Sequence, residues 1–138
     1  MNKEIEYIKE RAQGIAKYSD KLRQSIKDID TEMTPHFKDA GIIVFDDEFK
    51  YEDEYDIYKL GIFKAEYGQY AGMWGIFLEG HNGEESWIGD ASRKALVQAT
   101  SRIIPLLEKY SRILAQKELE YKVIAEKAEA MAGAITGL

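Results

Sequence analysis

The stretch between Ala91 and Ile135 decides the fold, and it has the sequence ASRKALVQATSRIIPLLEKYSRILAQKELEYKVIAEKAEAMAGAI. Its seam positions recur at alternating spacings of four and three, the period of a helix packed against another helix. They are Leu96, Thr100, Ile103, Leu107, Tyr110, Leu114, Lys117, Tyr121, Ile124, Ala128, Met131 and Ile135. A straight helix of this length would span ~65 Å, whereas a compact chain of this size has a radius of gyration of only ~14 Å. The helix must therefore bend or project from the rest of the protein.

Pro105 is the residue at which such a bend is expected. Proline has no backbone N–H, and its ring clashes with the carbonyl four residues earlier, here that of Ser101. In a helix interior this costs ~3 kcal/mol unless the helix kinks. We therefore expect the long C-terminal helix to be kinked near Pro105.

A second amphipathic helix is predicted from Glu4 to about Met33. Its seam keeps a heptad register with one polar interruption. The seam positions are Ile5, Ile8, Ala12, Ile15, Ser19, Leu22, Ile26 and Ile29. We expect this helix to end at Thr34-Pro35, because the residue before a proline is pushed out of helical backbone space.

Between the helices lie segments rich in β-branched and aromatic residues, at 41–45, 57–65, 71–79 and 84–88. The Asn82-Gly83 pair is a strong hairpin signal, and Gly72 and Gly75 indicate a bulge or a close backbone approach. The links are too short for parallel crossovers. The sequence therefore predicts a three- to four-stranded antiparallel β-meander, and with the helices a single α+β domain over residues 1–138.

The two helices are expected to pair antiparallel against one face of the sheet. A meander that returns near its origin would bring residues near Met33 close to residues near Leu96. The first helix spans only ~45 Å, so it leaves part of the longer helix uncovered. Uncovered apolar surface favours a symmetric homodimer.

Charge is distributed unevenly along the chain, although the net charge is only −6. Residues 46–90 hold twelve acidic residues and three lysines, a net charge of −9, whereas residues 91–138 carry +3. An acidic middle segment disfavours binding to nucleic acid through its phosphates. The predicted partners therefore exclude nucleic acid.

The acidic run that starts at Asp46 has three interpretations. Carboxylates bind hard cations such as Ca²⁺, but the run lacks the spacing of a calcium loop. An acidic sheet edge can instead dock a basic partner, or mimic the charge of nucleic acid. The third interpretation is a solvated loop that protects the sheet edge. The candidate docking residues in this run are Asp46, Asp47, Glu52 and Asp53.

No constellation for catalysis is evident in the sequence. There are no cysteines, and the two histidines, His36 and His81, both lie in predicted turns. Nucleophilic catalysis needs a base and an orienting group brought together, and a zinc site needs three or four ligands. We therefore predict a protein that is not an enzyme, with no catalytic residue, metal site or cofactor.

The chain contains no apolar run of the ~20 residues needed to cross a bilayer. Its first residues do not form an apolar signal-peptide segment. We therefore expect a cytoplasmic protein with no membrane partner.

The leading functional hypothesis is a homodimeric, non-enzymatic interaction module of the adaptor, chaperone-like or phage-associated accessory kind. It would use its paired helices, at Leu107, Tyr110, Leu114 and Tyr121, and its acidic sheet edge. One alternative is a sensory-type domain that binds a small ligand in an aromatic pocket between sheet and helices, lined by Tyr58, Trp74, Phe77 and Trp87. A further alternative is an acidic inhibitor that mimics nucleic acid.

Overall fold

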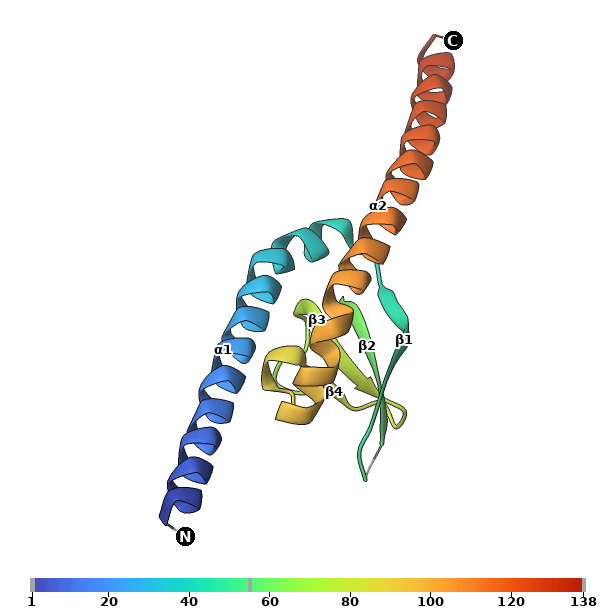
Figure 1. Cartoon of the computed structure of the whole chain (residues 1–138). Coiled ribbons are helices and arrows are strands. Elements are labelled where there is room, and N and C mark those ends of the chain that lie inside the picture. Colours follow the sequence, from blue (N-terminus) through green and yellow to red (C-terminus); the bar gives the residue numbers. More distant parts are fainter. Residues whose placement is uncertain (1, 55, 138) are drawn as a thin grey trace.

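A computed structural model describes residues 2–54 and 56–137 of the chain (Figure 1). The chain starts with the helix α1 (Asn2–Ala40) and ends with the helix α2 (Arg93–Thr136). Between them lie β1 (Val44–Glu52), β2 (Ile57–Lys64), β3 (Trp74–Gly80), β4 (Glu85–Trp87) and the 3-10 turn η1 (Ile88–Asp90). The predicted α+β class and the order of helix, meander and helix are confirmed.

The four strands form one antiparallel sheet in the order β1-β2-β3-β4. Strands β2 and β3 pair from Tyr58 opposite Gly80 to Lys64 opposite Trp74. β4 has only three residues, and its last partner on β3 is Phe77. Within the described residues, the start of β3 therefore has no neighbouring strand on its outer edge.

The first helix passes through Pro35, so the prediction that it ends at Thr34-Pro35 is wrong. Phe37, which follows the proline, is fully buried, and its ring meets that of Tyr110 edge to face with centroids 5.2 Å apart. Burial of this aromatic ring offsets the penalty of a proline in the helix. The helix ends where Gly41, with a φ of 65°, donates its N–H to the carbonyl of Phe37 at 2.9 Å.

The two helices run in the same direction, so the predicted antiparallel pairing is wrong (Figure 1). The start of α2 meets the middle of α1, because Arg93 Nε donates to Ser19 Oγ at 3.0 Å. The end of α1 meets the middle of α2, as the contact between Phe37 and Tyr110 shows, so both helices advance in the same direction.

The short fourth strand explains this arrangement. The prediction assumed that the meander returns the chain to the end of α1, but β4 stops after three residues and η1 turns the chain toward the middle of α1. There Arg23 Nη1 donates to the carbonyl oxygens of Gly89 at 2.9 Å and Ala91 at 2.7 Å. These hydrogen bonds fix the point from which α2 starts.

α2 is a single helix of 44 residues that continues through Pro105. Ser92 caps its start, because its Oγ accepts the N–H of Ala95 at 3.2 Å. A kink near Pro105 stays a prediction.

The main core joins side chains from both helices and the first three strands. Its largest fully buried members are Phe37, Leu60, Ile62, Ile76, Ile88, Leu96, Ile103 and Leu106. A smaller aromatic cluster consists of Phe63, Ala65 and Phe77, with Phe45, Tyr70 and Trp87 packed against it. Because most of the buried residues lie between Leu22 and Leu114, both ends of the chain extend beyond the core.

Candidate functional site

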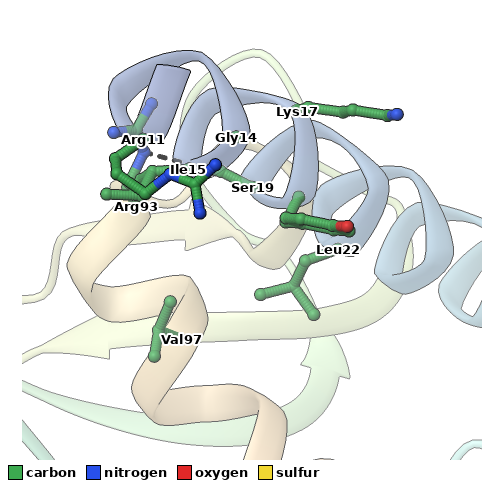
Figure 2. Close-up of a pocket in the computed structure, with 9 residues that line it drawn as sticks. Arg11, Gly14, Ile15, Lys17, Ser19, Leu22, Arg93 and Val97 are labelled. Carbon is green, nitrogen blue, oxygen red and sulfur yellow. Dashed lines mark hydrogen bonds between the residues drawn. The ribbon is translucent and has the colours of Figure 1, made fainter. Parts of the chain in front are cut away.

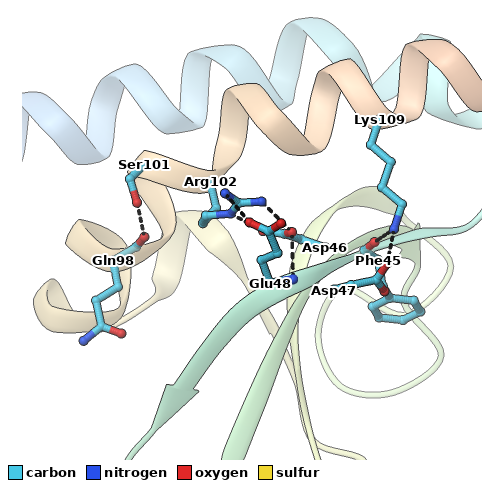
Figure 3. Close-up of polar contacts among 8 residues, drawn as sticks. All are labelled: Phe45, Asp46, Asp47, Glu48, Gln98, Ser101, Arg102 and Lys109. Carbon is cyan, nitrogen blue, oxygen red and sulfur yellow. Dashed lines mark hydrogen bonds and ion pairs between the residues drawn. The ribbon is translucent and has the colours of Figure 1, made fainter.

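The acidic start of β1 is neutralised by α2 of the same chain (Figure 3). The guanidinium of Arg102 donates to both carboxylate oxygens of Asp46, at 2.7 and 2.9 Å, and lies 3.1 Å from Glu48. Asp46 is only 6% exposed. These charge-assisted hydrogen bonds from Arg102 hold the pKa of Asp46 below its usual range.

A second ion pair lies about two turns of helix further along. Lys109 Nζ donates to Asp47 at 2.8 Å and to the carbonyl oxygen of Phe45 at 2.7 Å. The basic face of α2 thus meets acids of its own chain. A docking role for Asp46 and Asp47 stays a prediction, and it would require a partner to compete with these internal ion pairs.

The remaining acids of the run shape the hairpin between β1 and β2. Glu52 is the exposed last residue of β1. Asp53 Oδ1 accepts the N–H of Asp56 at 2.8 Å, and Asp56 accepts N–H groups from His81 and Asn82 at 3.0 and 3.1 Å. Within residues 2–54 and 56–137, no group of three or more His, Asp or Glu side chains is placed to hold a metal ion.

The four predicted interface residues of the long helix fall into different environments. Tyr110 is 2% exposed, and Leu107 and Leu114 are half-buried against the core. Tyr121 is 65% exposed. Only the part of the seam beyond Leu114 is therefore open to a partner.

Two helical arms extend from opposite ends of the core (Figure 1). We define the N-terminal arm as residues 2–21 of α1 and the C-terminal arm as residues 115–136 of α2. Every residue of the C-terminal arm is exposed. Large apolar side chains are exposed on both arms, namely Ile5, Tyr7, Ile8, Ile15, Tyr18, Leu119, Tyr121, Val123, Ile124, Met131 and Ile135.

A groove lies where each arm leaves the core. Figure 2 shows the groove of the N-terminal arm, about 630 Å³ in volume, which runs between α1 and the start of α2. Its apolar lining comes from Ile15, Tyr18, Leu22 and Val97, and its charged lining consists of Arg11, Lys17 and Arg93. A second groove of about 700 Å³ lies beside the C-terminal arm, with Leu114 and Tyr121 in its lining.

Three of the four residues predicted to form an aromatic pocket line one cavity. Trp74, Phe77 and Trp87 surround a cavity of about 270 Å³ between α1 and the edge of β3, together with Tyr70 and Asp30. We call it the Asp30 cavity.

The fourth predicted residue, Tyr58, lies outside this cavity, near the start of β2 and next to the hairpin between β1 and β2. Burial and the nearby carboxylate of Glu84, which accepts the tyrosine O–H at 3.4 Å, raise the pKa of Tyr58 to about 12. The sequence grouped these four aromatics by type, and the sheet register separates Tyr58 from the rest.

Asp30 is the residue that the sequence analysis missed. It is 4% exposed, and it reaches the unpaired edge of β3, where Oδ1 accepts the N–H of Ile76 at 2.6 Å. Its Oδ2 accepts the indole N–H of Trp87 at 2.8 Å. Burial raises the pKa of Asp30, and the hydrogen bonds from Ile76, Trp87 and Thr34 oppose that shift.

Two signals in the sequence point to Asp30 in retrospect. It follows Ile26 by four residues, so an acid lies on the buried side of the helix. Gly75 is the other signal, because glycine in a strand indicates a bulge or a close backbone approach, and what approaches Gly75 in the structure is the side chain of Asp30. A Cβ at position 75 would lie 3.1 Å from Asp30 Oδ1, so glycine leaves the space that the carboxylate needs.

Comparison with protein-family models, with curated proteins and with solved structures finds no match for this chain. No helix among the described residues is long and apolar enough to span a membrane. The structural features that bear on function are therefore the arms, the ion pairs and the Asp30 cavity.

Proposed function

We propose that this protein is a homodimeric interaction module in which the arms of one copy pair with the arms of a second copy. The observation that carries the proposal is the exposure of apolar side chains at heptad spacing on both arms. Large exposed apolar surfaces mark interaction sites. Most of the stability of a helix in a protein comes from the packing of its apolar face, so a partner that covers the arms would stabilise them.

The lengths and positions of the arms fit a second copy turned end for end. The N-terminal arm has 20 residues and the C-terminal arm 22, which correspond to ~30 and ~33 Å of helix. Because the arms leave the core at opposite ends, a two-fold axis across the long direction would bring each N-terminal arm beside the partner's C-terminal arm. All four arms would be covered in one symmetric assembly.

The seam residues of the two arms match in this antiparallel arrangement. Both seams repeat at spacings of three and four. With Ile8 of one copy opposite Met131 of the other, Ile15 falls opposite Ile124, and Ile5 lies one residue out of line with Ile135. Apolar residues then meet along most of the paired length, as in a two-stranded coiled coil.

Charge also favours this pairing over the association of like arms. The N-terminal arm carries five basic and four acidic residues, and the C-terminal arm carries three basic and four acidic residues. The groove beside the N-terminal arm is lined by Arg11, Lys17 and Arg93, without an acidic residue. An incoming C-terminal arm would bring Glu118, Glu126 and other acids toward these cations.

A basic protein is the partner that we infer for such a dimer. The acidic hairpin that carries Glu52 and Asp53 would dock it, in keeping with the net charge of −9 on residues 46–90.

The dimer is tested by sedimentation equilibrium of the wild type and of the double variant Ile8→Lys/Ile15→Lys. Each buried lysine is expected to raise the dimer dissociation constant by at least about tenfold, which corresponds to about 1.4 kcal/mol. Gln13→Lys is the matched control for each single substitution, because it adds one positive charge at an exposed position away from the seam. A wild type that remains monomeric at micromolar concentration would refute the proposal.

The direction of pairing is tested by disulfide formation between introduced cysteines. The chain has no cysteine of its own, so no native thiol competes with them. Under mild oxidation the Ile8→Cys/Met131→Cys variant is expected to form a covalent dimer. The Glu10→Cys/Met131→Cys variant places the first thiol on the opposite side of the helix and is expected to stay monomeric in denaturing gels. Equal cross-linking of the two variants would contradict the antiparallel register.

A further inference from the structure

We propose that the Asp30 cavity binds an organic ammonium group, held between aromatic rings and a buried carboxylate. Tyr70, Trp74, Phe77 and Trp87 line the cavity, and Asp30 contributes the carboxylate. Aromatic faces attract cations through the ring quadrupole, and quaternary or methylated ammonium ions are the usual ligands of such cages.

The rings of Tyr70, Phe77 and Trp87 pack against one another and form one aromatic wall of the cavity. The Tyr70 and Trp87 ring centroids are 5.4 Å apart, and those of Tyr70 and Phe77 are 6.4 Å apart. Tyr70 is held in place by its O–H, which donates to Asp90. Lys27 Nζ already lies 5.7 Å from the centre of the Trp87 ring, so this indole interacts with a cation of the protein itself.

Asp30 gives the cavity a preference for a positive charge over a neutral apolar group. Its oxygens accept hydrogen bonds from neutral donors, the Ile76 N–H and the Trp87 indole N–H. None of the ion pairs found among residues 2–54 and 56–137 includes Asp30. An ammonium ion would therefore supply the opposite charge that this buried carboxylate lacks.

The size and chemistry of the cavity restrict the ligand further. A water molecule's share of liquid volume is ~30 Å³, so a cavity of about 270 Å³ has room for a small methylated ammonium group. One carboxylate does not supply the several oxygen ligands that calcium or magnesium requires. The cavity lies beside the second half of α1, away from both arms, so the inference does not rest on the dimer.

Choline and its uncharged carbon analogue 3,3-dimethyl-1-butanol test the inference directly. Both tryptophans of the chain line the cavity, so tryptophan fluorescence reports on this site. At ionic strength held constant with NaCl, choline chloride is expected to give a saturable change with a dissociation constant on the order of millimolar. The uncharged analogue is expected to bind at least about tenfold more weakly.

Matched variants test whether the carboxylate of Asp30 causes the preference for choline over the uncharged analogue. Asp30→Asn is expected to weaken choline binding by about tenfold and to leave the affinity for the uncharged analogue unchanged. Glu32→Gln removes an exposed acid from the same helix and is expected to bind choline like the wild type. If Asp30→Asn does not fold by circular dichroism, Trp74→Leu replaces it, because loss of one aromatic wall should weaken choline binding by a similar factor.

Three results would overturn the inference. They are a fluorescence change that does not saturate with choline, equal affinity for choline and the uncharged analogue, and equal weakening by Asp30→Asn and Glu32→Gln.

Discussion

Replacing Asp30 by alanine tests whether this carboxylate is part of the framework that joins α1 to the sheet. The substitution removes the acceptor of two donors, the Ile76 N–H at 2.6 Å and the Trp87 indole N–H at 2.8 Å. Ile76 is fully buried, so after the change its N–H loses the acceptor that it has in the wild type. Trp87 is half-buried, so solvent can reach its indole in part.

The expected loss of stability follows from these two donors. A buried donor without an acceptor costs ~1–3 kcal/mol. The cost is expected to be larger for the Ile76 N–H than for the Trp87 indole N–H, because Ile76 is more deeply buried. Removing the carboxylate also removes its desolvation penalty, which burial imposes on the charged form. The net destabilisation by Asp30→Ala is therefore expected to be about 2–3 kcal/mol.

Urea unfolding followed by tryptophan fluorescence, at one fixed protein concentration, measures this change. Glu32→Ala is the matched control, an exposed acid on the same helix, and should change the free energy of unfolding by less than about 0.5 kcal/mol. If the Asp30→Ala variant unfolds at the same urea concentration as the Glu32→Ala variant, the hydrogen bonds of Asp30 do not stabilise the fold and the reasoning is refuted.

Three further predictions concern the same contacts and the ion pairs of β1. Gly75→Ala is expected to destabilise the protein by about 1–2 kcal/mol in urea unfolding, because its Cβ would displace Asp30 from Ile76, whereas Gly133→Ala, with no heavy atom within 4 Å, is not. Burial raises the pKa of Asp30 in the folded protein. The contribution of the protonated carboxyl to the free energy of unfolding is therefore fully present below the unfolded pKa of ~3.9, and it is lost as the pH rises through the folded pKa. The stability of the wild type relative to Asp30→Asn should therefore fall as the pH rises above about 4 and then level off, and a flat difference from pH 3 to 8 would contradict this. Arg102 lowers the pKa of Asp46, so the stability from that ion pair is present above the unfolded pKa of ~3.9 and is lost as the pH falls through the folded pKa. The difference in the free energy of unfolding between the wild type and Arg102→Gln should therefore become smaller as the pH falls. Arg112→Gln, which changes an exposed arginine of the same helix, is the control.

The elements of the fold were predictable from the sequence because their signals are local. The heptad seams identified both helices, and the Asn82-Gly83 turn and the short links identified the antiparallel meander. The direction of the helices was not predictable in this way. It depends on β4 ending after three residues and on Arg23 binding the carbonyls of η1, a contact between segments more than 60 residues apart.

The candidate site was likewise predictable only in those parts whose signals are local in the sequence. The sequence grouped Trp74, Phe77 and Trp87, and all three line the Asp30 cavity, where Phe77 and Trp87 are partners across β3 and β4. Their use as a ligand pocket stays a prediction. Asp30 was missed, since its partner Ile76 lies 46 residues away. The opposite charges of the middle segment and α2 were visible in the sequence, but the sequence did not show that Arg102 and Lys109 pair with Asp46 and Asp47 of their own chain.

The two buried aspartates of this protein are stabilised in different ways, and the contrast separates a structural group from a candidate binding group. Asp46 is surrounded by charge of the opposite sign, and both of its oxygens bind the guanidinium of Arg102. Asp30 is equally buried but binds only neutral donors, and aromatic rings line the cavity beside it. A buried carboxylate whose only purpose is to fasten a helix to a strand gains nothing from an adjacent cavity. A carboxylate that receives a cation needs that space, and this is why we place the ligand at Asp30 and not at the acidic strand.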